Sequence, residues 1–218
     1  PDVFIPIAES TGQIMDLTIW SLNVALRQAQ KWSSKWPGFQ IAINLSAAIL
    51  YDPNIIQIIK NALNMWSIEP DKVMFEVTES AVMLEPEHSL EVLKNLTELG
   101  LDLSIDDFGT GYSSLAYLKH LPVAELKIDK SFVLAMSQNE DDKIIARTII
   151  ELGHNFNLSV IAEGVEDKET MTELASLGCD KGQGYYMSRP VTESELYEFI
   201  QSSEWKLKPD DTGDSVIG

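Results

Sequence analysis

The chain has 218 residues, of which 44% are hydrophobic and 23% charged, a composition that fits one globular domain better than two. Its net charge of −18 argues against binding polymeric nucleic acid, because a Lys/Arg excess is needed to displace the counterions of the phosphate backbone. No apolar run reaches the ~20 residues of a membrane span, and the single cysteine, Cys179, has no internal disulfide partner, so we expect a cytoplasmic domain.

Six short apolar segments, bounded by polar or turn residues, predict β-strands. They are residues 39–45, 72–78, 101–106, 124–129, 158–163 and 182–187. Helical periodicity lies between them, at residues 13–36, 54–66, 87–99, 139–156 and 168–177. Asp167 is the expected N-cap of the last of these, and a capping box at Thr192–Glu195 starts a final helix. We therefore expect one domain over residues 1–205, followed by a flexible tail or linker over residues 206–218.

Strands that alternate with helices indicate an α/β fold with parallel strands joined by right-handed crossovers. Two such folds compete, the open doubly wound sheet and the (β/α)₈ barrel. No Gly-x-Gly-x-x-Gly turn follows the first strand, which weakens the case for a dinucleotide-binding sheet.

Polar residues stand at the carboxyl end of each predicted strand, where packing alone does not call for them. They are Asn44, Glu76, Asp106, Asp107, Lys127, Asp129, Glu163 and Gln183. Successive strand ends are separated by 20 to 36 residues, about one strand and helix each. In a barrel all strand ends converge on the face that carries the active site, so this pattern favours the barrel.

The strand-end residues predict a metal centre. Oxygen ligands without His or Cys suit a hard cation such as Mg²⁺ or Mn²⁺, and adjacent aspartates suit two ions, one carboxylate bridging both. The expected ligands are Asn44, Glu76, Asp106 and Asp107. Lys127 would hold the attacking water or neutralise developing charge, and Glu163 would act as general base or as a ligand of the second ion.

Other interpretations of these residues stay open from the sequence. Asn44 alone fits a turn or cap, and Lys127 alone fits a salt bridge to one of the acids. Acidic strand ends with a lysine also fit Mg²⁺-assisted proton abstraction, as in enolase-type barrels, although the adjacent aspartates favour two metals over one.

Several long stretches of the chain resemble the EAL domain family, bacterial phosphodiesterases that hydrolyse cyclic di-GMP to linear pGpG. The matching stretches are PDVFIPIAESTGQI, INLSA, FEVTES, IDDFGTGYSSLAYL, LKIDKSFV, VIAEGVE and GCDKGQGYYMSRP, and they run in family order. The resemblance implies a modified TIM (β/α)₈ barrel with one antiparallel strand.

The resemblance also implies roles for individual residues. Asn44, Glu76, Asp106 and Asp107 match the family's metal ligands, while Lys127 and Glu163 match residues at the attacking water. Asp129 and Glu166 match supporting residues near the metals, Gln183 matches a polar residue of the substrate site, and Glu79 matches a glutamate that steadies the loop FGTGYSSL after Asp107.

The Glu-Ala-Leu motif that names the family is expected upstream of residue 1, together with the first strands of the barrel. Its glutamate is a further metal ligand in the family. The resemblance implies a homodimer fused to sensory or cyclase domains, with cyclic di-GMP as substrate. The alternative is a catalytically silent receptor that binds cyclic di-GMP and signals through a partner.

Overall fold

The computed structural model describes residues 3–33, 35–36, 38–111 and 115–203, so the predicted tail at 206–218 lies outside the described residues. The chain divides into two compact units. Unit 1 holds the described residues up to Ile105 together with 111–123, and unit 2 holds 106–110 and the described residues from Ala124 onward. Strand β3 (Asp102–Phe108) contributes to both units. Among the described helices, none is long and apolar enough to cross a membrane.

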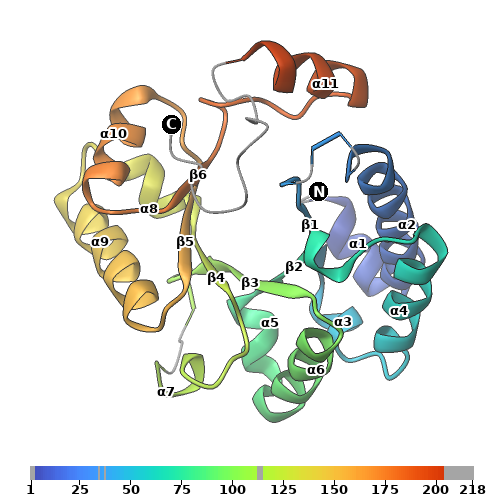
Figure 1. The fold of residues 1–218 in the computed structure, drawn as a ribbon. Coiled ribbons are helices and arrows are strands. Elements are labelled where there is room, and N and C mark those ends of the chain that lie inside the picture. The colour runs from blue at the N-terminus through green and yellow to red at the C-terminus, as the bar shows by residue number, and fades with distance from the viewer. Residues whose placement is uncertain (1–2, 34, 37, 112–114, 204–218) are drawn as a thin grey trace. The chain divides into compact units, whose positions relative to one another are not determined.

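Unit 1 is built on parallel strands covered by helices (Figure 1). Its elements are α1 (Phe4–Ser10), α2 (Ile14–Ser33), β1 (Ile41–Leu45), α3 (Ala47–Leu50), α4 (Ile55–Trp66), η1 (Pro70–Lys72), β2 (Val73–Thr78), α5 (Glu79–Leu84), α6 (Pro86–Glu98), the start of β3, and α7 (Leu115–Leu118). β1 pairs with β2 in parallel, Ile41 opposite Val73 and Leu45 opposite Val77. Helix α2 packs against β1 and α4.

Helix α4 shows how the apolar pattern becomes the core of unit 1. Ile55, Ile59 and Leu63 are buried on one face, whereas Ile58 is half-buried. Full burial of such a side chain contributes roughly 1.5–3 kcal/mol. The helix ends at Ser67, whose φ of 51° takes the chain out of the helical conformation.

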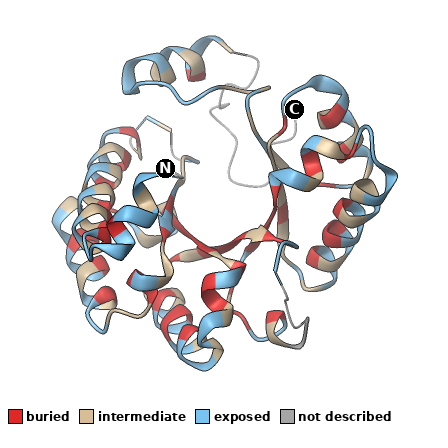
Figure 2. Cartoon of the chain, turned by 180° about the vertical axis from the view of Figure 1, so that it is seen from behind, coloured by how far each residue is buried: buried red, intermediate tan, exposed pale blue. Residues whose placement is uncertain are grey.

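Unit 2 continues the alternation of strand and helix. Its elements after β3 are β4 (Glu125–Ile128), α8 (Lys130–Ala135), α9 (Glu140–Asn155), β5 (Ser159–Glu163), α10 (Lys168–Ser176), β6 (Lys181–Gln183) and α11 (Glu193–Ser202). β5 pairs in parallel with β4 on one side and β6 on the other. Helix α9 packs against β4 and β5, and buried residues line the strands in Figure 2.

All six predicted strands are present, but the last prediction was too long. β6 ends at Gln183, so residues 184–187 are not a strand as expected. The Met187 and Ser188 N–H groups both donate to the Gly184 carbonyl, which makes this segment a turn. The predicted N-cap is confirmed, since Asp167 Oδ1 accepts from the Thr170 N–H at 2.7 Å. Short helices such as α1, α5 and α8 were not predicted.

Candidate active site

The centre of the candidate site in unit 2 is Lys127, on β4, whose side chain is only 2% exposed. Its Nζ lies 3.2 Å from Asp106 Oδ1 and 2.5 Å from Glu163 Oε1. A buried ammonium needs such partners, because an unpaired charge in the interior costs several kcal/mol. Lys127 therefore forms salt bridges, which is one of the interpretations that the sequence left open. The two partners, Asp106 and Glu163, are themselves predicted site residues.

The end of β3 brings two adjacent carboxylates to one place. Neighbouring residues of a regular strand point to opposite faces, but Asp107 has a φ of 53°, in the left-handed region that is uncommon for residues other than glycine. Oxygen atoms of Asp106, Asp107 and Glu163 all lie within 4.8 Å of one another. The strained backbone at Asp107 thus accompanies a local concentration of negative charge, as strained residues at functional sites often do.

The pKa of Asp107 reflects this crowding, being raised to about 6 from its ordinary value of 3.8. The largest cause is removal of the carboxylate from water, followed by repulsion from Asp106 and by the charge and hydrogen bond of Asp129. A cation among these oxygens would reverse the effect of the repulsion, because it favours the ionised form of each acid.

Asp129 is held in place by the start of α8. Its Oδ1 accepts hydrogen bonds from the Ser131 N–H, at 2.9 Å, and from the Ser131 hydroxyl. Asp129 is the N-cap of this helix, a position that Asp favours because its side chain accepts backbone N–H groups. Sequence reasoning missed the contribution of Ser131, although an Asp directly before a helix that begins with Lys130 and Ser131 is the pattern that reveals such a cap.

Gln183 lies directly beside Glu163, because the two residues are register partners at the ends of β6 and β5. One backbone hydrogen bond joins the loop after Glu163 to β6, from the Val165 N–H to the Gln183 carbonyl (3.1 Å), and a second joins it to the turn after β6, from the Tyr186 N–H to the Val165 carbonyl (2.9 Å). A Cβ on Gly184 would lie 2.1 Å from that Val165 carbonyl oxygen. Glu166, the next residue of the loop, is exposed.

The remaining predicted site residues belong to unit 1. Asn44 and Glu76 are register partners at the ends of β1 and β2, so their side chains come from neighbouring positions. Glu76 is buried and Asn44 is exposed. Glu79, in the first turn of α5, is buried, and its Oε1 lies 2.5 Å from where a Cβ on Gly111 would stand. Glu79 therefore lies against the backbone of the loop that it was expected to steady.

The donor set of the strand ends fits a hard divalent cation. Asp106, Asp107 and Glu163 supply three carboxylates at close quarters, and oxygen donors are those that Mg²⁺ and Mn²⁺ prefer. The pKa of Asp107 is raised first by its removal from water and then by repulsion from Asp106, so the negative charges crowd one another here. The three carboxylates are therefore chemically suited to bind a metal ion.

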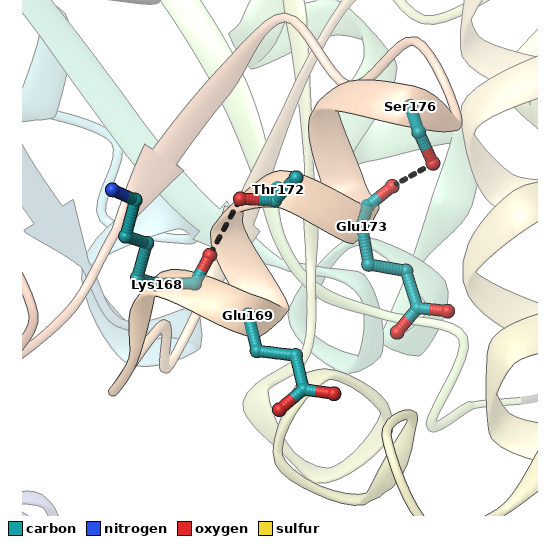
Figure 3. Close-up of a pocket in the computed structure, with 5 residues that line it drawn as sticks. All are labelled: Lys168, Glu169, Thr172, Glu173 and Ser176. Carbon is teal, nitrogen blue, oxygen red and sulfur yellow. Dashed lines mark hydrogen bonds between the residues drawn. The ribbon is translucent and has the colours of Figure 1, made fainter.

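A separate surface depression occurs on α10, lined by Lys168, Glu169, Thr172, Glu173 and Ser176 (Figure 3). None of these is a predicted site residue. Glu173 pairs with Lys143 of α9 at 2.5 Å, and that hydrogen bond raises the lysine pKa. The depression is the outer surface of one helix and offers no match to the strand-end chemistry.

Parallel strands with acids and a lysine at their carboxyl ends define the class of α/β proteins that place a polar site at strand ends. A family model described as the EAL domain matches residues 1–190, and the chain belongs to this family. A solved structure described as the PaMucR phosphodiesterase in complex with c-di-GMP has a TM-score of 0.88 and 42% identity, covering 90% of this chain and 80% of that one. This agreement confirms the predicted fold class, the modified TIM barrel of EAL domains.

Two curated relatives show the same resemblance in sequence. The signaling protein YkoW of Bacillus subtilis is 44% identical over 92% of this chain. The bifunctional diguanylate cyclase/cyclic di-GMP phosphodiesterase MucR of Pseudomonas aeruginosa is 42% identical over 90% of this chain. The chain spans only 25% of the length of the first relative and 29% of the second.

Proposed function

We propose that this chain hydrolyses cyclic di-GMP to linear pGpG in a reaction that depends on Mg²⁺ or Mn²⁺. The observation that carries the proposal is the buried Lys127 joined to both Asp106 and Glu163, beside a third carboxylate. The resemblance to MucR, named as a cyclic di-GMP phosphodiesterase, supports the choice of substrate. A purely structural salt bridge would not need a third carboxylate, Asp107, crowded against the two that pair with Lys127.

We assign the metal ligands of the site to Asn44, Glu76, Asp106 and Asp107, for two ions. The support is chemical, since all four offer oxygen donors from the carboxyl ends of β1, β2 and β3. When bound, the ions would supply Lewis acidity toward the phosphodiester and the attacking water.

The protein's own groups account for the proton and the charge. Glu163 accepts the proton of the attacking water at a carboxylate oxygen, while the Lys127 ammonium at 2.5 Å orients that carboxylate. The water oxygen forms a bond to phosphorus, the bond from phosphorus to O3′ breaks, and O3′ takes up a proton from solvent, to which Glu163 releases the proton it accepted. The product is linear pGpG with a 5′-phosphate.

Four further residues complete the proposed site. Asp129, fixed by Ser131, holds the position of Asp107, to which it hydrogen-bonds. Gln183, beside Glu163, contacts the substrate. Glu166 supports the loop after Glu163, and Glu79 supports the loop at Gly111 through their close contact. These four residues position other groups or bind the substrate, and Glu163 alone carries out the proton transfer.

The surroundings of the domain are part of the same proposal. The EAL-type domain covers residues 1–205 and is followed by a tail or linker at 206–218. It acts in the cytoplasm, as a homodimer, fused to sensory or cyclase domains. The low share of each curated relative that this chain covers supports such fusion, because those relatives are much longer.

Chromatography of cyclic di-GMP incubated with the protein carrying this chain tests the function. We expect pGpG with Mg²⁺ or Mn²⁺, and none after chelation by EDTA. Glu163→Gln should stop pGpG formation, while the matched change Glu169→Gln, on the exposed surface of α10, should leave it intact (Figure 3). Calorimetric binding of cyclic di-GMP without turnover, with both metals present, would instead establish the silent receptor.

A further inference from the structure

A second ion pair joins β4 and β6, at positions that precede the proposed site residues on the same strands. Lys181, the first residue of β6, places its Nζ 2.8 Å from Glu125 Oε2, on β4. Glu125 is 4% exposed, so its carboxylate is almost fully removed from water. An unpaired carboxylate there would be costly, and Lys181 supplies the compensating charge.

The strand register shows that this pair reaches across β5. Glu125 is the register partner of Ser159, whereas Lys181 is the partner of Ile161, so β5 stands between the two. Each member lies two residues before a proposed site residue on its own strand, Glu125 before Lys127 and Lys181 before Gln183. Because side chains alternate along a strand, Glu125 and Lys127 point to the same face.

This arrangement creates a competition for the Lys127 ammonium. Residues two apart on a strand are separated by about 7 Å, a span that a flexible lysine stem and a glutamate can bridge. Lys127 instead bonds to Asp106 and Glu163, toward the strand ends. Lys181, half-exposed, occupies the Glu125 carboxylate that would otherwise attract Lys127 away from them.

We propose that Lys181 is a positioning residue, which neutralises Glu125 and so keeps Lys127 on Asp106 and Glu163. This inference rests on the proposed function for its kinetic consequences, but its structural consequence is independent of any activity. It assigns to Lys181 a role that depends on the presence of Glu125. A mere structural tie between β4 and β6 would be weakened equally by removing either member of the pair.

The kinetic test compares Lys181→Met, Glu125→Gln and the double variant, with Lys143→Met as the control for loss of another lysine–glutamate pair. We expect Lys181→Met to lower kcat at least about tenfold, because Lys127 leaves Glu163, the general base. Glu125→Gln and the double variant should both stay within about twofold of the original kcat, because no carboxylate competes. A double variant as impaired as Lys181→Met, or an unaffected Lys181→Met, would overturn the proposal.

Two further measurements keep the proposal testable in every case. If Lys181→Met does not fold, the proposal can still be tested, because it requires equal kcat values for Glu125→Gln and for the double variant. A lower kcat for the double variant would contradict the proposal. A crystal structure of Lys181→Met needs no hydrolysis. It should show Lys127 Nζ bonded to Glu125 and moved from Glu163 Oε1. An unmoved Lys127 would refute the positioning role even if the protein hydrolyses cyclic di-GMP, and a moved one would support it even if it does not.

Discussion

Lys127 Nζ lies 2.5 Å from Glu163 Oε1 and 3.2 Å from Asp106 Oδ1, so one ammonium links the ends of three strands, β3, β4 and β5. Removing it should therefore affect both stability and turnover. We expect Lys127→Met to lower the free energy of unfolding of the metal-free protein by about 3 kcal/mol, because two carboxylates lose their buried partner. Added Mg²⁺ should bind these two carboxylates and restore part of the lost free energy of unfolding.

Urea unfolding with and without Mg²⁺ measures this effect, and the rate of pGpG formation measures its consequence for catalysis. Lys143→Met is the matched control, because it removes a lysine from the more exposed pair with Glu173 and should have a much smaller effect. Equal effects of the two variants would show that the Lys127 cluster has no special role.

Asp106→Asn should weaken metal binding at least about tenfold, because a neutral amide donates less charge to a divalent cation than a carboxylate does. Titration calorimetry with Mn²⁺ checks this directly. Glu169→Gln removes one negative charge from α10 and should leave the affinity unchanged. Equal affinities of wild type and Asp106→Asn would place the metal elsewhere.

Gly184→Ala should destabilise the protein by about 1–3 kcal/mol and lower kcat, because overpacking forces the backbone to move. The added methyl group would meet the Val165 carbonyl oxygen at 2.1 Å, in the loop that directly follows Glu163. At Gly182 the nearest atom to an added Cβ is the Met171 Sδ at 3.1 Å, a flexible side chain. Gly182→Ala should therefore cost less in both thermal unfolding and turnover, and the reverse order would contradict the account.

Cys179 gives a prediction for the dependence of stability on pH. Burial is the largest cause that raises the pKa of this thiol from 9.0 to about 11, and its Sγ lies 3.3 Å from the Lys181 carbonyl. Between pH 9 and 11 the unfolded chain loses the thiol proton while the folded chain keeps it. The folded state then binds more protons, so the contribution of Cys179 is complete below pH 9 and is lost as pH rises toward 11.

The difference in unfolding free energy between wild type and Cys179→Ala isolates this thiol from the lysines and tyrosines that titrate in the same range. From pH 8 to pH 11 the unfolding free energy of the wild type should fall by on the order of 2 kcal/mol relative to that of Cys179→Ala. A difference that stays constant over that range would show that the thiol ionises without cost in the folded protein.

The strand-end site could be predicted because strand and helix alternate plainly and the polar residues interrupt apolar runs. Lys127 and Glu163 stand out in this way, and the structure brings them together. The left-handed conformation of Asp107 could not be predicted, since no glycine marks the position and most residues other than glycine avoid it. The Glu125–Lys181 pair could not be predicted from the sequence either, because 56 residues separate its members and only the sheet register brings them together.

The most direct test of the central claim is hydrolysis of cyclic di-GMP in ¹⁸O-labelled water, followed by mass spectrometry of the product. With Mg²⁺ or Mn²⁺, the account predicts pGpG with one ¹⁸O atom in its terminal phosphate, and none of this product from Glu163→Gln. Recovery of unchanged cyclic di-GMP from the wild-type protein with either metal would contradict it.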